Sequence, residues 1–357
     1  MKVVWALPRF NKPRTGGEKV LEKLIELLCS RGDEIIEVYA ESETKNGVLG
    51  TINKQYQNYR ILRAEDGKAP IIQNLLNRPE YFIANILLRY LKGRRIVLFV
   101  KETYEDEGFS VIRKQYHRFI NNITFRSVSL IVVNSQYTGD WVCRYGDFRD
   151  KIHILYPVLK SCSNSVVRVG KKPSDSVNIL CVGNIRRNKG QIYLLEAFKD
   201  LPAHVKVTFV GMVKEDEYMD KLQRYIEDHD ISNRVRFTGF LSDFDLFDEY
   251  SKADLFVSPT LKEGFGQAVH EAMAHGLPVI ASRVGALSEI VEDGKSGILV
   301  APENSKALAD AIRRIVGNVE YGNTLGKEAR ARSTIFQTVD AQVDVLRGLF
   351  MKLRPGC

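Results

Sequence analysis

Short apolar runs alternate along the chain with segments whose apolar residues recur at helical spacing. The apolar runs predict strands at 2–7, 94–100, 129–135, 151–156, 177–183, 205–211, 234–239, 254–260, 278–282 and 297–300. The segments with helical spacing predict helices at 16–32, 113–127, 136–146, 190–201, 217–228, 243–252, 267–275, 286–292 and 305–317. Continuous apolar strands that alternate with helices are typical of parallel sheets covered on both faces, so the pattern predicts an α/β fold.

The same pattern predicts two doubly wound domains joined by a linker. Residues 161–176, SCSNSVVRVGKKPSDS, are polar and rich in Ser and Lys, as linkers often are. They separate an N-terminal domain at 1–160 from a C-terminal domain at 177–333, and we expect 334–357 to return to the first domain as a helix. Ligands of doubly wound sheets bind beyond the carboxyl ends of the strands, so we expect the site in a cleft between domains that face each other.

The positive charge of the chain is concentrated in its N-terminal half. Residues 1–170 hold 27 Lys and Arg against 18 Asp and Glu, whereas residues 171–357 hold 25 against 26. This excess favours an anionic partner for the first domain, such as a phosphorylated substrate or an anionic lipid surface, although a solvated basic surface gives the same pattern. Nucleic acid is not an expected partner, because no RNA-binding module is recognisable.

The cysteines and the apolar runs indicate a cytoplasmic protein. The five cysteines are scattered, odd in number and without CxxC spacing, which argues against a disulfide framework and a zinc site. No apolar run approaches the ~18 residues that a membrane helix needs. The N-terminal run at 3–7 is too short for a signal peptide.

The stretch EGFGQAVHE at 263–271 is the most informative candidate for chemistry. It joins a predicted strand to a predicted helix, and Gly264 and Gly266 lack Cβ atoms, so a ligand can approach the backbone. A helix that starts near Gly266 presents N–H groups suited to phosphate. Carboxylates such as those of Glu263 and Glu271 accept pairs of hydroxyls, as in a ribose diol or a sugar ring; alternatively, each is a solvated surface charge.

Residues 253–302, from ADLFVSPTLKEGFGQAVHE to GILVAP, resemble the signature region of the family 4 retaining glycosyltransferases of GT-B fold. The hallmark of that family is E-x7-E, here Glu263 and Glu271. The resemblance continues through 182–198 and 235–259 and reaches RTGGEKVLEKLIE at 14–26. The resemblance covers most of the chain. In the C-terminal half specific sequence motifs match, whereas in the N-terminal half mainly the order of strands and helices matches. It implies the GT-B fold, with two Rossmann-like domains facing a central cleft.

The resemblance implies a role for each matched residue. Glu263 would contact the hydroxyls of the donor sugar, Glu271 the ribose of the nucleotide, and Lys189 the diphosphate leaving group. Lys189 and Glu263 are therefore the expected catalytic residues. The reaction needs a sugar that is held firmly and a phosphate leaving group whose growing negative charge is stabilised. The other expected donor-binding residues are Gly16, Gly17, Asn184, Arg186, Phe240, Leu241, Gly264, Phe265, Gly266 and Gln267.

Two positions depart from the family pattern. The family usually carries Gly-Arg where this chain has Gly183-Asn184, so Arg186 or Arg187 is the candidate source of the missing charge. Many members carry a histidine after the strand here predicted at 94–100, where this chain has Lys101 and Glu102. These two residues are the candidates for the acceptor side of the site.

The remaining polar motifs favour structural roles. Asp243-Phe244-Asp245 spells the D-x-D metal motif of the other glycosyltransferase fold, but it follows Ser242 at a predicted helix start, where capping favours Asp. His270 and His275 lack the partners of a metal site, so neither a metal nor another cofactor is expected. The basic and aromatic stretch 113–126 is either a half-buried helix or a helix that contacts a membrane surface or an anionic acceptor.

Together these features predict a metal-independent, retaining hexosyltransferase. It would move a sugar from a nucleotide-diphosphate sugar to a glycan or lipid-linked acceptor, in the cytoplasm or peripherally at the inner face of the membrane. Two alternatives use the same residues. A nucleotide-sugar epimerase or hydrolase of the same fold would turn over the donor without an acceptor, and a non-catalytic protein would bind the nucleotide-sugar without turnover.

Overall fold

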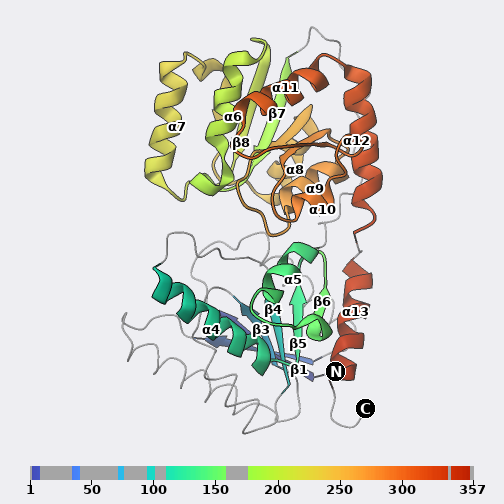
Figure 1. Ribbon diagram of the computed structural model, residues 1–357. Helices are drawn as coiled ribbons and strands as arrows, with labels where there is room; N and C mark the ends of the chain where they lie inside the picture. The colour runs from blue at the N-terminus through green and yellow to red at the C-terminus, as the bar shows by residue number, and fades with distance from the viewer. Residues whose placement is uncertain are drawn as a thin grey trace. The chain divides into compact units, whose positions relative to one another are not determined.

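The computed structural model describes the backbone of residues 2–8, 34–40, 71–75, 95–100, 110–157, 176–336 and 339–353, and the side chains of these segments from 95 onwards except 339–340. The chain forms two compact units, one of Met1–Val158 with Gln337–Cys357 and the other of Leu159–Phe336 (Figure 1). Each unit contains a six-stranded sheet, and every strand pairing that is described in these sheets is parallel. The predicted α/β class is confirmed.

The sheet of the first unit has the strand order β2-β1-β3-β4-β5-β6. Its strands are β1 (Lys2–Pro8), β2 (Glu34–Ala40), β3 (Ile71–Leu75), β4 (Ile96–Val100), β5 (Leu130–Val133) and β6 (Ile152–Ile154). The apolar pattern predicts four of these strands but not β2 or β3. Both β4 and β5 are buried along their whole length, as strands covered on both faces should be.

Three helices of the first unit are described, namely α4 (Val111–Ser127), α5 (Gln136–Cys143) and α13 (Val339–Lys352). Aromatic rings form the core between α4 and α5, where Phe125 lies edge-to-face against Trp141 and Phe148. The side-chain amide of Gln342 in α13 donates a hydrogen bond to the Tyr156 carbonyl after β6. The predicted helix at 16–32 and almost all of the predicted linker at 161–176 lie outside the described residues.

The sheet of the second unit has the strand order β12-β11-β10-β7-β8-β9. Its strands are β7 (Val177–Val182), β8 (Val205–Val210), β9 (Val235–Phe237), β10 (Leu255–Ser258), β11 (Val279–Ser282) and β12 (Ile298–Val300). Each of them lies within a predicted apolar run. Strand β7 is central, pairing with β8 on one side and with β10 on the other.

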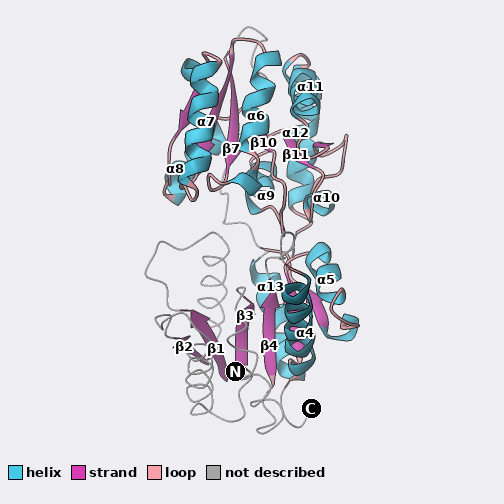
Figure 2. Cartoon of the chain, turned by 60° about the vertical axis from the view of Figure 1, so that its left-hand side comes forward, coloured by secondary structure: helices cyan, strands magenta, loops and turns pink. Residues whose placement is uncertain are grey.

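Helices cover both faces of this second sheet (Figure 1, Figure 2). They are α6 (Gln191–Ala197), α7 (Asp216–Asp228), α8 (Asp243–Lys252), α9 (Gln267–Ala274), α10 (Leu287–Ile290), α11 (Ser305–Val316) and α12 (Val319–Ser333). All except α12 overlap a predicted helix. Neighbouring residues of β10 point to opposite faces, since Phe256 stacks on Tyr250 of α8 whereas Val257 joins the cluster beneath α6 and α11.

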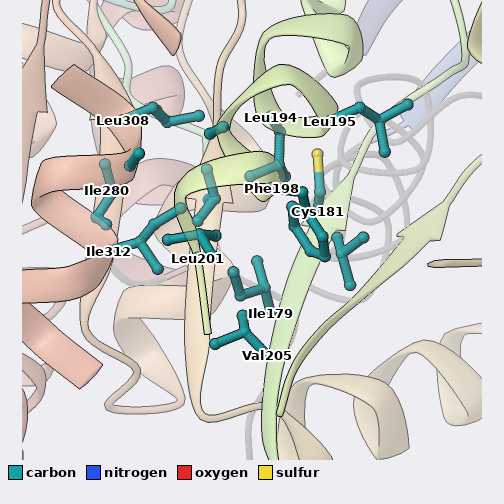
Figure 3. Close-up of a cluster of buried hydrophobic side chains, with 14 of the residues drawn as sticks. Ile179, Cys181, Leu194, Leu195, Phe198, Leu201, Val205, Ile280, Leu308 and Ile312 are labelled. Carbon is teal, nitrogen blue, oxygen red and sulfur yellow. The ribbon is translucent and has the colours of Figure 1, made fainter. Parts of the chain in front are cut away.

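The largest hydrophobic cluster of the second unit lies between the sheet and helices α6, α7 and α11. Figure 3 shows part of it, with Leu194 and Leu195 of α6, and Phe198 directly after α6, beside Ile179 and Cys181 of β7. Burial raises the pKa of the Cys181 thiol to about 12, so this side chain is a neutral core residue. The cluster fixes α6 and β7, and therefore also the loop that connects them.

Candidate functional site

The loops that follow β7 and β10 are tied together by hydrogen bonds. Because β7 and β10 are parallel neighbours, both loops leave the sheet at the same edge. The Leu261 amide donates to the Asn188 carbonyl at 2.8 Å. The buried Thr260 hydroxyl lies 3.0 Å from both the Asn188 and the Lys262 carbonyl oxygens. This edge is where ligands of doubly wound sheets bind.

The two predicted catalytic residues are in direct contact. The Lys189 Nζ lies 2.7 Å from Oε2 of Glu263, and each side chain is 21% exposed. Lys189 ends a short 3-10 turn at Arg187–Lys189 in the loop after β7, and Glu263 lies in the loop after β10. The ion pair between Lys189 and Glu263 therefore links the two loops, and solvent can reach it.

The second motif glutamate is held by two neighbours. In α9, the Gln267 amide donates to Oε1 of Glu271 at 3.2 Å, while the Tyr250 hydroxyl of α8 lies 3.0 Å from Oε2. Tyr250 is 2% exposed and stacks on His275, with 4.8 Å between ring centroids. Tyr250 lies outside the sequence motif, and its role depends on the packing of α8 against α9.

Helix α9 begins without a capping side chain. Its N-cap residue is Gly266, which has the left-handed conformation with φ of 98° and offers no side-chain hydrogen bond. The preceding Phe265 is buried, so the turn between Gly264 and Gln267 is anchored in the unit. Backbone N–H groups at such a helix start favour anionic ligands.

The structure distinguishes between the two arginines proposed to replace the family arginine. The Arg187 guanidinium binds the carboxylates of Glu215 at 3.6 Å and Glu217 at 3.3 Å, near the start of α7. In contrast, the Nε of Arg186 is buried without a hydrogen-bond partner among the described residues. Asn184 is half-buried, and its carbonyl accepts a hydrogen bond from Gln191 at 3.0 Å. Arg186 is therefore the better candidate for an anionic ligand.

The other residues predicted for the donor and acceptor sides of the site are only partly described. Phe240 and Leu241 follow the turn at Gly239, whose carbonyl accepts from Gly211 at 2.9 Å, and Phe240 is 52% exposed. Gly16, Gly17, Lys101 and Glu102 lie outside the described residues, so their roles stay predictions.

The two histidines near the motif pack inside the second unit. His270 is 1% exposed, lies between Phe265 and Phe336, and its Nε2 is 3.1 Å from the Ser333 carbonyl. Burial lowers the pKa of His270 to about 4, so the imidazole is neutral near pH 7. The His275 Nδ1 lies 2.8 Å from the Glu271 carbonyl. His270 packs α9 against the segment around Ser333, and His275 caps the end of α9, so both have structural contacts of the kind that the sequence favours.

The D-x-D sequence begins a helix, as predicted, and Ser242 is the capping residue. The Ser242 hydroxyl accepts a hydrogen bond from the Asp245 amide at 3.2 Å and donates to its carboxylate at 2.6 Å, at the start of α8. Asp243 is exposed in the same turn. Among the residues that the structure describes, no group of three or more His, Cys, Asp or Glu side chains is placed to hold a metal ion.

The residues around this site are similar to a known protein family. Residues 165–332 match the family described as Glycosyl transferases group 1. The chain is 30% identical over 219 residues to D-inositol 3-phosphate glycosyltransferase of Paenarthrobacter aurescens, covering 58% of this chain and 53% of that protein. It is 31% identical over 170 residues to lipopolysaccharide core biosynthesis mannosyltransferase LpcC of Rhizobium leguminosarum, covering 45% and 48%. The chain thus spans about half the length of the curated relatives it matches.

A solved structure matches the fold of the whole chain. The Anabaena protein HepE (Alr3699), crystallised in complex with UDP-glucose, superposes with a TM-score of 0.78 at 21% identity, over 99% of this chain and 100% of that one. The predicted fold class is therefore confirmed. We conclude that this chain has the GT-B fold and that its residues 165–332 are similar to the Glycosyl transferases group 1 family.

Proposed function

We propose that the chain is a retaining glycosyltransferase of family 4 that moves a hexosyl group from a nucleotide-diphosphate sugar to a glycan or lipid-linked acceptor. The observation that carries this proposal is the contact between Lys189 and Glu263 inside the region that is similar to the Glycosyl transferases group 1 family. The two side chains place a cation for a leaving phosphate beside a carboxylate for sugar hydroxyls. The UDP-glucose complex of the Anabaena protein supports a nucleotide-sugar as the donor class.

The second glutamate suits the nucleotide part of such a donor. Each carboxylate oxygen of Glu271 already has one protein donor, from Gln267 or Tyr250. Carboxylate oxygens accept hydrogen bonds from hydroxyl groups, so a carboxylate held in this way suits the two hydroxyls of a ribose. Tyr250 thus orients Glu271 toward a vicinal diol, and the turn at Phe240 and Leu241 would meet the base.

Charge stabilisation of the leaving group is the main catalytic requirement. As the bond between sugar and phosphate breaks, negative charge grows on the diphosphate, and preorganised cations and N–H groups lower the barrier. Lys189, Arg186 and the start of α9 would supply these groups. Glu263 would hold the sugar while the acceptor attacks from the side of the leaving group, which retains the anomeric configuration.

Glu271→Ala is expected to weaken nucleotide binding, with or without the sugar. Loss of a charged hydrogen-bond acceptor costs about 1.5–3 kcal/mol, or roughly ten- to a hundredfold in affinity. Tyr250→Phe should give a smaller loss, because Gln267 still holds the carboxylate. Isothermal titration calorimetry on folded variants measures both effects, and unchanged affinity in Glu271→Ala would remove the ribose assignment.

Transfer is expected to proceed without a divalent metal. Lys189, Arg186 and backbone N–H groups are proposed to meet the charge that a metal stabilises in other enzymes. Initial rates after extensive EDTA treatment should equal those with added Mg²⁺ or Mn²⁺. A strict dependence on either ion, restored when it is added back, would contradict this and direct attention to Asp243 and Asp245.

We propose further that α4 brings the enzyme to an anionic membrane or acceptor. Its first turns expose Ile112 at 80%, Tyr116 at 54% and Phe119 at 60%, at spacings that align them on one side of a helix. Arg113, Lys114 and Arg118 are exposed between them, and the helix contains no acidic residue. Apolar and basic residues together are typical of helices that lie in a membrane interface. Within the described residues, no helix is long and apolar enough to span a bilayer.

Changing Arg113, Lys114 and Arg118 together to Ser should weaken binding to anionic vesicles. Each exposed cation near an anionic bilayer contributes about 1 kcal/mol, so the triple variant should lose roughly a hundredfold at low salt. The matched control changes Lys199, Lys206 and Lys221, which are exposed on the second unit, to Ser. Vesicle sedimentation at low salt decides the matter: equal binding by the two triple variants would assign the charge of α4 to plain solvation.

The function as a whole is tested in two steps. A thermal-shift screen with UDP-, GDP- and ADP-sugars should identify one nucleotide class that stabilises the protein. Turnover of that donor is then followed with and without glycan or lipid-linked acceptors. Rapid turnover without an acceptor would favour the epimerase or hydrolase, and stabilisation without turnover under any condition would favour a binding protein.

A further inference from the structure

The ion pair between Lys189 and Glu263 joins two groups to which the proposed function gives different ligands. Lys189 would bind the diphosphate and Glu263 the sugar, yet in the ligand-free chain they bind each other at 2.7 Å. Among the described residues, neither side chain has another hydrogen-bond partner that competes with this contact. Donor binding must therefore break the pair and supply a new partner to each member.

The environment makes an unpaired state costly. Each side chain is 21% exposed, so both groups have lost much of their contact with water. Removing one partner of a largely buried ion pair leaves an uncompensated charge, and this penalty commonly exceeds what the intact pair contributes to stability. For Glu263 the penalty is larger when a diphosphate is bound, because two negative groups then lie close together.

On this basis we propose that Lys189 and Glu263 exchange partners when the donor binds, and that the exchange makes the site select an intact nucleotide-sugar over the free nucleoside diphosphate. An intact donor gives phosphate oxygens to Lys189 and sugar hydroxyls to Glu263. A free nucleoside diphosphate satisfies Lys189 but leaves the Glu263 carboxylate without a partner. Glu263 then competes for Lys189, which favours release of the nucleoside diphosphate product. This inference rests on the proposed function and extends it to specificity.

The diagnostic variant is Glu263→Gln, for which the proposal predicts opposite changes for the two ligands. The amide no longer attracts Lys189 by charge or repels the diphosphate. The free nucleoside diphosphate should therefore bind about tenfold more tightly, the size expected for one charged hydrogen bond. The nucleotide-sugar should bind no more tightly, because its hydroxyls lose a charged acceptor. Inorganic pyrophosphate, a probe without base or ribose, should gain affinity in the same way as the nucleoside diphosphate.

Two further variants separate the exchange from a general effect of charge. Asp216→Asn removes one exposed carboxylate at the start of α7. This residue is three positions after Val213, which forms a β-bridge with Ile185 in the loop after β7. The substitution should leave the ratio of the two affinities unchanged. Lys189→Gln should weaken both ligands. In the double variant, Glu263→Gln should bring a clearly smaller gain, because only the relief of repulsion from the diphosphate remains once the lysine is absent.

The affinities are measured by calorimetry without acceptor. The ligands are the nucleoside diphosphate that binds the wild-type chain, chosen from UDP, GDP and ADP, and the nucleotide-sugar with the same nucleotide. Circular dichroism and thermal unfolding establish that each variant is folded, and Glu263→Ala replaces the Gln variant if that one is not. The proposal is overturned if Glu263→Gln tightens the nucleoside diphosphate no more than Asp216→Asn does, or if its gain is undiminished without Lys189. Failure of the proposed function looks different, because the wild-type chain would then bind and turn over none of these nucleotide-sugars.

Discussion

Replacing Lys189 by alanine is expected to lower kcat for sugar transfer by about 100- to 1,000-fold, the range found when a group that stabilises transition-state charge is removed. Lys189 is the cation in direct contact with Glu263, and the proposed mechanism uses it to meet the charge on the departing diphosphate. The effect should fall on kcat as well as on donor affinity, since that charge increases as the transition state is reached.

The control for this prediction is Lys206→Ala, which removes an exposed lysine from β8 of the same sheet. Steady-state kinetics with saturating acceptor should give wild-type kcat for the control. If Lys189→Ala retains more than about a tenth of wild-type kcat, stabilisation of the leaving group must come mainly from Arg186 and backbone N–H groups, and the central role of Lys189 is wrong.

Gly285→Ala should destabilise the second unit strongly and remove activity at the same time. Gly285 has φ of 52°, and a Cβ atom there would lie 1.9 Å from the Glu263 carbonyl oxygen. The backbone of Glu263 would have to move, because a carbonyl held by the Ala286 amide at 3.2 Å cannot rotate away freely. We expect a loss of about 3 kcal/mol or more in the free energy of unfolding, as for other substitutions that create a backbone clash.

The matched control is Gly294→Ala, which isolates the cost of the backbone conformation. Gly294 has φ of 76°, but a Cβ atom there meets nothing within 4 Å. Its substitution should cost about 1 kcal/mol, the penalty for a left-handed residue with a side chain. Urea unfolding gives both values. Similar losses in the two variants would mean that close approach to Glu263 is not what requires glycine at position 285.

The fold of the second unit could be predicted almost completely from the apolar pattern, whereas two strands of the first could not. Strand β2 reads EIIEVYA, so glutamates interrupt its apolar run, and β3 has only five residues, IIQNL. Helix α12 was missed for another reason. Gly326 allows it to pack closely on the turn after α9, since a Cβ atom there would lie 2.2 Å from the Gly276 carbonyl oxygen. A glycine used for close packing leaves no apolar signal at that position.

The sequence allowed the residues of the site to be predicted, but not the contacts between them. Glu263 and Glu271 belong to one motif, and the resemblance added Lys189 to them. The ion pair of Glu263 with Lys189 joins residues 74 positions apart, and the bond from Tyr250 to Glu271 joins residues 21 apart. Both contacts depend on which strands are neighbours in the sheet and on how α8 packs against α9. Spacing along the sequence does not contain that information.

The strand order of the second sheet also determines when the site can exist during synthesis. Strand β7 pairs with β8, the next strand along the chain, but its other neighbour is β10, which follows much later. A nascent chain therefore carries Lys189 long before Glu263 has been added. Bringing the two residues together then costs conformational entropy of the chain segment between them. A fragment that ends before β10 can retain β7, β8 and the lysine, yet it lacks the carboxylate that pairs with it. The ion pair at this edge is thus acquired only once β10 and the loop that follows it have been made.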